Sequence, residues 1–360
     1  MNKSLSYAVR ATDRCNLNCR YCYAKTEKPQ DMSLATLVRI LEQMADYNAG
    51  ETVISWTGGE PLLMGRAFFE LVLATQRRLG KKFTNILQTN AILLDKNWIE
   101  FLLANNFQVR TSLDFPPELH DEMRQAGNFS ATLEKIKLMV ATGLPVNVNT
   151  VITNRNIDKV EEIYAFLKQL AISSFSVSRM VLQGNALINH DLAIRENSEF
   201  GLFLVKLFDL WINDRNEPRI ARITPLDKLL NACQSYLRHD DKDPCFHCQD
   251  QLLAIGPGGE VYPSCNKFFG VPESCLGNIT DRNLAEVLKS PERGKFLSEV
   301  SAVTERLCSE CEFMPICEGG CFYIAYNIRH EAEQITGREQ FCKGYYLILA
   351  RIMDYLREGK

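Results

Sequence analysis

The 360-residue sequence lacks a basic excess, a long apolar run and a secretion signal. Its 41 Lys and Arg are outnumbered by 44 Asp and Glu, and a net charge of -3 argues against a nucleic-acid partner, which needs a cationic surface. No run of about 18 apolar residues occurs, so we expect no membrane contact. The N-terminal residues MNKSLSYAVRATDRCN contain no apolar core of a signal peptide, and we therefore expect a cytoplasmic protein.

Cysteine is absent from a long central stretch and crowded on both sides of it. Of the 13 cysteines, three lie within residues 15–22, none lies between residues 23 and 232, and the others lie between Cys233 and Cys342. Because the cytosol is reducing, disulfides explain this odd number poorly. Such grouping favours metal or iron–sulfur sites over scattered core thiols.

The first half of the chain alternates strand-like and helix-like segments. We expect strands at the β-branched or apolar runs Leu5–Thr12, Thr52–Thr57, Phe83–Thr89, Gln108–Asp114, Val146–Thr153 and Ser173–Met180. Segments of helical period separate them, for example Leu34–Tyr47, Ala67–Leu79 and Ile157–Leu170. This α/β alternation predicts a parallel sheet closed into a partial (β/α)6 barrel, in which the chemistry lies at the C-terminal ends of the strands.

The composition changes after a Phe- and Leu-rich helix expected at Ser198–Asn213. Asp214–Pro225 is expected to be a linker, and from Cys233 onward Cys, Gly, Pro and short strands dominate. We therefore expect a barrel domain at residues 1–215, a bridging region at 216–244, and a Cys-rich domain with a C-terminal helix at 245–360.

The first cysteine group, Cys15, Cys19 and Cys22, has the spacing C-x3-C-x2-C directly after the first expected strand. Three thiolates leave one iron of a [4Fe–4S] cluster open, like the open position of a catalytic metal site. An amino acid's amine and carboxylate can chelate that open iron. The alternative is a zinc site that is one ligand short.

A second motif, Gly58-Gly59-Glu60-Pro61, follows one strand–helix unit later. Its glycines lack Cβ atoms, so backbone carbonyls can face an ammonium group; a simple strand-end turn is the alternative. Together with Tyr21 before the third cysteine, the two motifs resemble the radical S-adenosylmethionine (SAM) superfamily. Gln88-Thr89-Asn90 is similar to that family's QTN, and Ser112-Leu113-Asp114 with His120-Asp121 is similar to its SLD…HD segment.

The resemblance implies which residues contact SAM. They are Tyr21, Gly58, Gly59, Glu60, Pro61, Gln88, Ser112 and Arg124. Strand-end hydrogen bonding is the alternative role for Gln88, Ser112 and Arg124. Asp114 and Asp121 are equally well explained as helix caps, and His120 is expected to be a packed loop residue and not a base.

The later cysteines follow the pattern Cys308-x2-Cys311-x5-Cys317-x3-Cys321, with Cys342 further on. This pattern resembles the SPASM domain, which implies one auxiliary [4Fe–4S] cluster on Cys308, Cys311, Cys317 and Cys342. A second would use Cys245, Cys248, Cys265 and Cys321, making three [4Fe–4S] clusters in all. Ser264 stands where that family usually has cysteine, so Cys265 needs a shifted turn.

The Cys-rich region also allows a different metal. Two structural zinc sites are the alternative to the auxiliary clusters, since C-x2-C pairs suit tetrahedral sulfur ligation. Cys233 and Cys275 fit neither cluster and are expected to be plain thiols. His247 is expected to be a loop residue.

The resemblance implies an enzyme that cleaves SAM to a 5′-deoxyadenosyl radical and removes hydrogen from an unactivated carbon. Two branches compete: anaerobic sulfatase maturases, which form formylglycine from Cys or Ser, and maturases of ribosomally made precursor peptides. Asn266 stands where sulfatase maturases carry Asp, and an amide cannot act as a base. Thr57 replaces their Gln, and the segment from Arg179 to Ala186 looks more like that of the peptide-modifying and cofactor-making members. We therefore favour a precursor-peptide maturase that forms a crosslink, such as a cyclophane.

The implied partners are a peptide or protein substrate and an external one-electron donor of the flavodoxin or ferredoxin type. Only 14 residues precede Cys15, so we expect no N-terminal leader-binding domain. The peptide would then bind directly, or through a separate leader-binding protein. A small-molecule radical dehydrogenase is a further alternative. An iron–sulfur electron-transfer or scaffold protein is the non-enzyme alternative, but such a protein needs no SAM pocket.

Overall fold

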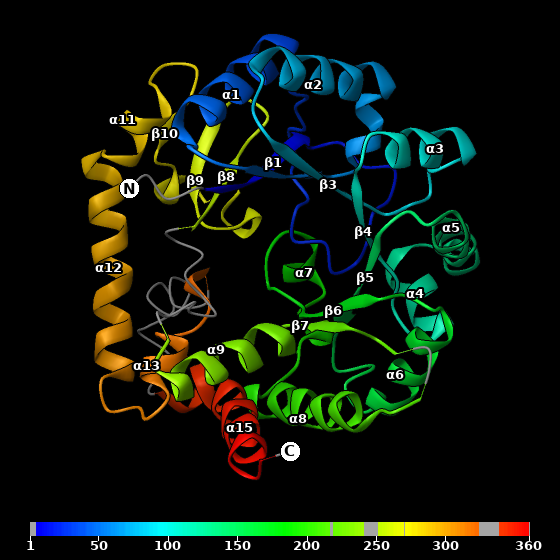
Figure 1. The fold of residues 1–360 in the computed structure, drawn as a ribbon, viewed down its shortest axis with the longest axis vertical. Coiled ribbons are helices and arrows are strands. Elements are labelled where there is room, and N and C mark those ends of the chain that lie inside the picture. The colour runs from blue at the N-terminus through cyan, green and yellow to red at the C-terminus, as the bar shows by residue number, and fades with distance from the viewer. Residues whose placement is uncertain (1–4, 217–218, 241–250, 270, 324–337, 360) are drawn as a thin grey trace.

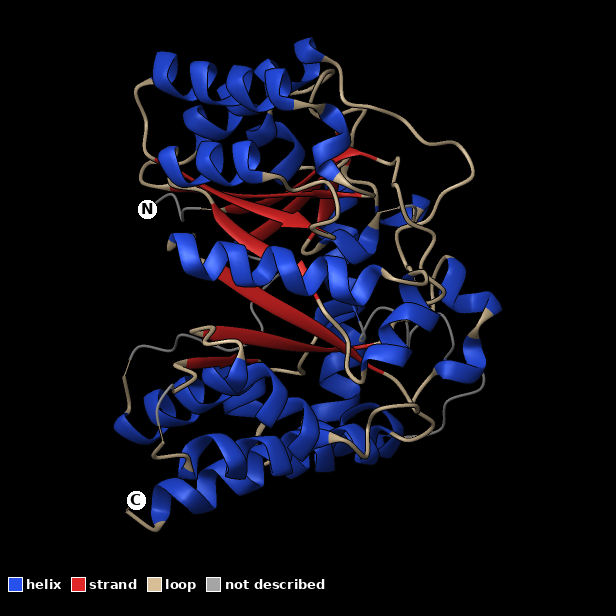
Figure 2. Cartoon of the chain, turned by 90° about the vertical axis from the view of Figure 1, so that its right-hand side faces the viewer, coloured by secondary structure: helices blue, strands red, loops and turns tan. Residues whose placement is uncertain are grey.

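The computed structural model describes residues 5–216, 219–240, 251–269, 271–323 and 338–359. Its strands form one sheet of ten, in the order β10-β9-β8-β1-β2-β3-β4-β5-β6-β7. The sheet curves around the centre of the molecule, and helices lie on its outer side (Figure 1). A side view shows the helices above and below the strands (Figure 2).

All six strands expected in the first half are present, with ends shifted by two residues at most. They are β1 (Ser6–Thr12), β2 (Thr52–Gly58), β3 (Phe83–Thr89), β4 (Gln108–Ser112), β5 (Val146–Ile152) and β6 (Ser174–Arg179). Each pairs in parallel with the next along the chain. The expected parallel α/β barrel sheet is therefore confirmed.

Helices of the expected period cover the outer face of this sheet. They are α1 (Leu34–Tyr47), α2 (Arg66–Leu79), α3 (Lys96–Ala104), α4 (Pro117–Arg124), α5 (Asn128–Thr142), α6 (Val160–Gln169) and α8 (Asn197–Asn213). The side chain of Ser33 caps α1 by accepting a hydrogen bond from the Thr36 amide at 3.0 Å. Buried side chains such as Ile40, Trp56 and Phe69 form the core between helices and strands, each contributing about 1.5–3 kcal/mol through burial.

One strand lies inside the segment expected to be a linker. Arg222–Thr224 forms β7, which pairs in parallel with β6, and α9 (Leu226–Arg238) follows it. The expectation of an irregular linker over Asp214–Pro225 is therefore wrong for these residues. Three residues are too few for an alternating pattern, and Ile223 alone faces the core.

The Cys-rich region shares the same sheet. β8 (Leu252–Ile255) pairs in parallel with β1, and β9 (Glu260–Pro263) pairs antiparallel with β8 and with β10 (Gly277–Asn278). The remaining elements are α7 (Asn185–Ile188), α11 (Leu284–Leu288), α12 (Pro291–Cys308), α13 (Met314–Cys317), α15 (Arg338–Arg357), η1 (Pro61–Met64), η2 (His190–Leu192), η3 (Asn266–Phe268) and η4 (Pro272–Ser274). No helix in the described part of the chain has both the length and the apolar character of a membrane span.

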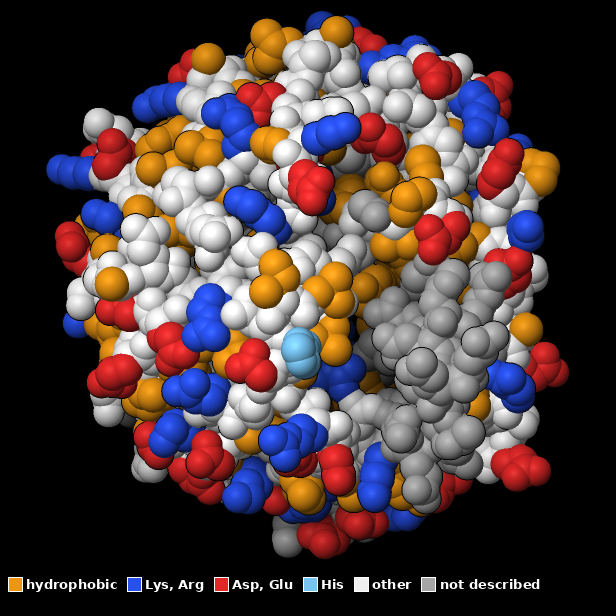
Figure 3. Space-filling model, turned by 180° about the vertical axis from the view of Figure 1, so that it is seen from behind, with side chains coloured by type: hydrophobic (Ala, Val, Ile, Leu, Met, Phe, Trp, Pro, Cys, Tyr) orange, Lys and Arg blue, Asp and Glu red, His pale blue; other side chains and the backbone are white. Residues whose placement is uncertain are grey.

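The inner face of the sheet is polar on one side of the barrel. Val109, Val148 and Phe175 are buried in the main hydrophobic core under the helices, so their neighbours in sequence point toward the barrel interior. The face opposite to that of Figure 1 is hollowed near its middle (Figure 3). The strands thus surround an interior that can admit ligands.

Candidate active site

The loop between β1 and α1 carries Cys15, Cys19 and Cys22, and its backbone is held from two sides. The Cys22 amide donates to the carbonyl of Cys19 at 3.2 Å, and the Asn185 amide donates to the carbonyl of Cys22 at 2.9 Å. The side chain of Asn185 also donates to the Cys19 carbonyl at 3.0 Å. The sequence pointed to Asn185, at the start of α7, only through the resemblance of its segment, and the structure shows that it fixes the cysteine loop.

The three thiols form a donor set suited to iron. Burial raises the pKa of Cys15 to about 11, although the Leu17 amide donates to its sulfur at 3.4 Å. Burial likewise raises the pKa of Cys19. Soft thiolates are the ligands of iron–sulfur clusters, and ligation must displace the thiol protons.

The two glycines of the Gly58–Pro61 motif lie against the start of the cysteine loop. A Cβ atom at Gly58 would overlap the carbonyl oxygen of Thr12, and one at Gly59 would overlap the carbonyl of Arg14. The Gly59 amide donates to the Thr12 carbonyl at 2.9 Å, and the Glu60 amide donates to the Arg14 carbonyl at 2.8 Å. Close approach of two backbones therefore explains why glycine is needed here. The expected contact with an ammonium group stays a prediction.

Glu60 connects the ends of β2 and β3. Its carboxylate is fully buried and accepts hydrogen bonds from the Leu62 amide at 3.0 Å, the Thr89 hydroxyl at 2.8 Å and the Asn90 amide at 2.8 Å. Burial raises its pKa to about 7. Asn90 also donates to the side chain of Asn16 at 2.8 Å. Hydrogen bonds thus connect the cysteine loop, the Gly-Gly motif and the end of β3 at the C-terminal edge of the sheet.

Tyr21 and Arg124, both expected to contact SAM, lie in a buried network around Asp114. The Tyr21 hydroxyl donates to Asp114, and Nε of Arg124 donates to the same carboxylate oxygen at 3.0 Å. The Arg124 guanidinium lies 5.2 Å from the centre of the Tyr21 ring. The Val151 amide donates to the other oxygen at 2.9 Å. Asp114 therefore joins the cysteine loop to β5 and does not cap a helix.

The remaining residues of the SLD…HD segment have structural roles. Asp121 accepts hydrogen bonds from the amides of Gly127 at 3.0 Å and Phe129 at 2.7 Å at the start of α5, as a helix cap does. His120 is buried, and its Nδ1 accepts from the Asp114 amide at 3.1 Å. Burial lowers the pKa of His120 to about 4. The expectation that His120 is packed is therefore confirmed, but it lies in α4 and not in a loop.

The other expected SAM contacts lie at the same edge of the sheet. Pro61 is buried at the start of η1, while Gln88 and Ser112 are half-buried on the inner faces of β3 and β4. The structure thus gathers these residues at the C-terminal ends of β2, β3 and β4. Their contact with SAM remains a prediction.

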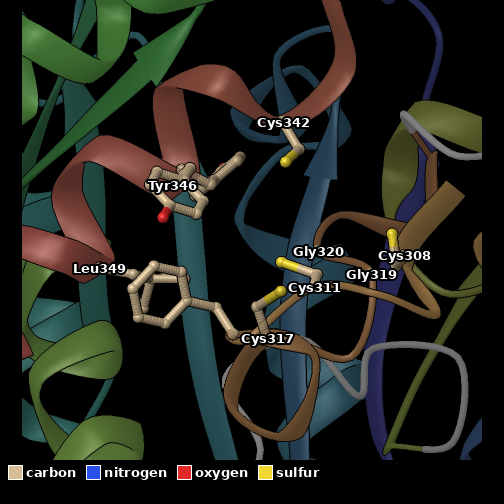
Figure 4. A pocket seen from close by; sticks show the side chains of 10 residues that line it. Cys308, Cys311, Cys317, Gly319, Gly320, Cys342, Tyr346 and Leu349 are labelled. Carbon is tan, nitrogen blue, oxygen red and sulfur yellow. The ribbon is translucent and has the colours of Figure 1, made fainter. Parts of the chain in front are cut away.

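Cys308, Cys311, Cys317 and Cys342 line one pocket, together with Phe313, Tyr345 and Leu349. They come from the end of α12, the segment up to α13, and α15. Figure 4 shows the sulfurs of Cys311, Cys317 and Cys342 directed into the same space. Burial raises the pKa of Cys317 to about 11. The fourth cysteine, Cys342, comes from the distant helix α15. That these four cysteines together hold a cluster stays a prediction.

The second expected auxiliary site is described only in part. Cys245, Cys248 and His247 lie outside the described residues. Burial lowers the pKa of Lys267, but the nearby thiols of Cys321 and Cys265 raise it, with a net increase. Ser264 adopts a left-handed φ of 64°, which supplies the shifted turn before Cys265. These positions are compatible with the expected pairing of Cys265 and Cys321.

The two unassigned cysteines are free thiols in the structure. Cys233 is buried in α9, and the Cys275 thiol donates to the Gly277 carbonyl at 3.6 Å. Among the described residues, no three Cys, His, Asp or Glu side chains converge closely enough to hold a single metal ion.

Two family models match the chain. The model of the radical SAM superfamily matches residues 9–167, and that of the SPASM iron–sulfur cluster-binding domain matches residues 234–312. The chain is 26% identical to a cysteine-type anaerobic sulfatase-maturating enzyme of Clostridium novyi, covering 89% of this chain and 88% of that protein. It is also 26% identical to the serine-type enzyme of Bacteroides thetaiotaomicron, covering 95% and 87%.

A solved structure shows the same fold over the whole length. The structure of anSMEcpe with bound S-adenosylmethionine has a TM-score of 0.82 at 25% identity and covers 98% of both chains. The same protein with S-adenosylmethionine and the Cp18Cys peptide has a TM-score of 0.81 at 25% identity and covers 99% of both. The chain therefore carries a radical SAM domain followed by a C-terminal SPASM domain, and it is an enzyme of redox chemistry that binds SAM and iron–sulfur clusters.

Proposed function

We propose that this enzyme oxidises a side chain of a peptide or protein substrate, as sulfatase-maturating enzymes do, converting Cys or Ser to formylglycine. The observation that carries this proposal is the full-length match to anSMEcpe bound to a peptide. The curated relatives support the same activity, since both are named as sulfatase-maturating enzymes and match nearly the whole chain. These findings favour sulfatase-type maturation over the crosslinking activity that the sequence alone suggests.

The residues of the chain fit the cofactors that this activity needs. Cys15, Cys19 and Cys22 would hold the first cluster, and Cys308, Cys311, Cys317 and Cys342 an auxiliary one. Cys265 and Cys321, with Cys245 and Cys248, would hold a third. When bound, the reduced first cluster supplies one electron to SAM, and the resulting 5′-deoxyadenosyl radical removes hydrogen from the substrate. Glu60 and Asp114 would keep the SAM-facing strand ends in place through their buried hydrogen bonds.

The oxidation also requires the loss of a second electron and a proton. From Ser this gives the aldehyde directly; from Cys it gives a thioaldehyde, which water then converts to the aldehyde with release of hydrogen sulfide. Cys265 follows β9, a strand of the same sheet as the barrel strands, so an auxiliary cluster held there would be suited to accept the electron. An external protein of the flavodoxin or ferredoxin type would supply and remove electrons. The binding of SAM in the barrel would exclude water from the reacting carbon.

Crosslinking is a second candidate because of Asn266. The amide of Asn266 lies beside the hydroxyl of Tyr23, the residue after Cys22. An amide cannot take the proton that aldehyde formation releases, whereas a crosslink needs no base at this position. A separate leader-binding protein would be expected only with this second activity.

One experiment separates the two activities. The anaerobically reconstituted enzyme is incubated with reductant, SAM and the Cp18Cys peptide or its Ser counterpart. The products are then treated with a hydrazide, which reacts with aldehydes, and their masses are measured by mass spectrometry. We expect a hydrazide-reactive aldehyde. A product that has lost two hydrogens but does not react with hydrazide would instead establish crosslinking, and unchanged peptides beside abundant deoxyadenosine would refute both for this peptide class.

A further inference from the structure

Two arginines lie in one row across four neighbouring strands of the barrel. Arg110 of β4 is in register with Asn147 of β5, Asn147 with Ser174 of β6, and Ser174 with Arg222 of β7. Neighbouring strands are about 4.8 Å apart, so the two arginine Cα atoms are separated by about 14 Å. Extended arginine side chains can bridge much of that distance toward the middle of the row.

All four residues point to the barrel interior. The residues next to them in sequence, Val109, Val148, Phe175 and Ile223, are buried in the main hydrophobic core, and side chains alternate between the two faces of a strand. Arg110 and Arg222 are both accessible to solvent. They therefore line an interior surface that solvent reaches.

Neither arginine has an acidic partner in the part of the chain that the structure describes. In the described ranges of the chain, no ion pair or side-chain hydrogen bond involves Arg110 or Arg222. Burial lowers the pKa of Arg110, and the positive charge of Arg222 lowers it further. The two cations are thus near enough to repel each other in a partly enclosed space, where repulsion is screened less than on an open surface.

The centre of the row offers fixed hydrogen-bonding groups. The Asn147 amide nitrogen donates to the Ser174 hydroxyl at 3.2 Å, and the Asn147 oxygen accepts from the Ser176 hydroxyl at 2.9 Å. These bonds orient the Asn147 amide and leave one of its two N–H groups for another acceptor. An anion between the arginines would meet donors on both sides and at the centre.

We propose that Arg110, Asn147 and Arg222 form a carboxylate-binding site inside the barrel, which takes an acidic side chain of the substrate peptide. A carboxylate is the group that guanidinium binds with two parallel hydrogen bonds, and it relieves the repulsion between the two arginines. The identity of the carboxylate as part of a peptide rests on the proposed function. The site itself rests only on the row of residues.

The test uses the full-length reconstituted enzyme and two neutral-ended probes, acetyl-Asp-N-methylamide and acetyl-Asn-N-methylamide. Saturation-transfer NMR should show binding of the aspartyl probe and much weaker binding of the asparaginyl probe. The double variant Arg110→Met/Arg222→Met should weaken binding of the aspartyl probe at least tenfold. A second double variant, with Arg110→Lys in place of Arg110→Met, should recover part of that binding. Inorganic phosphate, added as a competitor, tests whether a free anion occupies the site better than a peptide carboxylate.

The matched control is Arg77→Met, because Arg77 is exposed in the last turn of α2. It should leave binding unchanged. The site would be overturned if the two probes bound equally, or if Arg77→Met lost as much binding of the aspartyl probe as the double variant. The peptide ligand would be overturned if phosphate displaced the probes strongly and the aspartyl probe were not preferred. Deoxyadenosine release is measured in parallel: its presence in the double variant shows an intact fold, and its absence in the wild type would count against the proposed function alone.

Discussion

Gly201 of α8 and Gly344 of α15 lie in direct backbone contact where the two helices cross. A Cβ atom at Gly201 would overlap Cα of Gly344, and one at Gly344 would overlap the carbonyl oxygen of Asn197. An ion pair between Arg351 and Asp209, at 2.7 Å, joins the same helices further along. Cys342 precedes Gly344 by two residues, so this crossing fixes a cysteine of the auxiliary pocket against a helix of the barrel.

Gly201→Ala should therefore force the helices apart and destabilise the protein by about 1–3 kcal/mol, as overpacking of a close contact does. It should also lower iron content, because the displaced α15 carries Cys342, while deoxyadenosine release continues. Thermal unfolding and iron analysis measure both effects. Gly294→Ala is the control, since Gly294 lies in α12 with open space around its Cβ position. An unchanged melting temperature for Gly201→Ala would contradict the crossing.

Glu60→Ala should destabilise the folded protein by about 1–3 kcal/mol, because it leaves the Leu62 and Asn90 amides and the Thr89 hydroxyl without their buried acceptor. It should also reduce deoxyadenosine release, since the ends of β2 and β3 lose their connection. Denaturant unfolding measures the first effect. Glu70→Ala removes only an exposed pair with Arg66 and should change stability by less than about 0.5 kcal/mol. An equal loss of unfolding free energy in both variants would show that the Glu60 contacts do not stabilise the ends of β2 and β3.

His120 should make the stability of the apoprotein depend on pH. Burial lowers its folded pKa to about 4, below the ordinary value of 6.5, so the unfolded chain binds the proton more readily. The contribution of His120 is fully present above about pH 6.5 and is lost as the pH falls toward 4. His120→Gln should flatten this part of the stability–pH profile measured by urea unfolding. An identical slope in the variant would show that His120 does not carry it.

Cys22→Ala and Cys317→Ala should have different effects, because the two cysteines belong to different sites. Cys22→Ala should abolish SAM cleavage and keep most of the iron, whereas Cys317→Ala should lower iron content and keep SAM cleavage. Deoxyadenosine release and iron analysis on the two variants, with Cys275→Ala as the control, measure this. Loss of SAM cleavage in both variants to the same degree would contradict the separation of the sites.

Much of the fold and the location of the candidate active site could be predicted from the sequence, because local patterns determine them. The period of the apolar residues predicted the first six strands, and the spacing of Cys15, Cys19 and Cys22 placed their loop after β1. β7 could not be predicted, because Arg222–Thr224 is too short for a pattern and gains its place by pairing with β6. Its position is a tertiary effect.

The contacts within the site were less predictable than its location. The Gly58-Gly59 motif was correctly placed, but its contact with the carbonyls of Thr12 and Arg14 depends on how two loops meet. The network of Tyr21, Asp114 and Arg124 joins residues about one hundred positions apart, and no local pattern shows it. Likewise, the choice between sulfatase-type oxidation and crosslinking was drawn from single replacements such as Asn266, and the full-length relatives favour the opposite branch.

The central claim is tested most directly on the anaerobically reconstituted wild-type protein, by measuring iron and sulfide content together with deoxyadenosine release upon reduction with SAM. We expect about twelve irons per chain, four for each of three clusters, and deoxyadenosine formation that depends on Cys15, Cys19 and Cys22. Near-zero iron, bound zinc and intact SAM would contradict it.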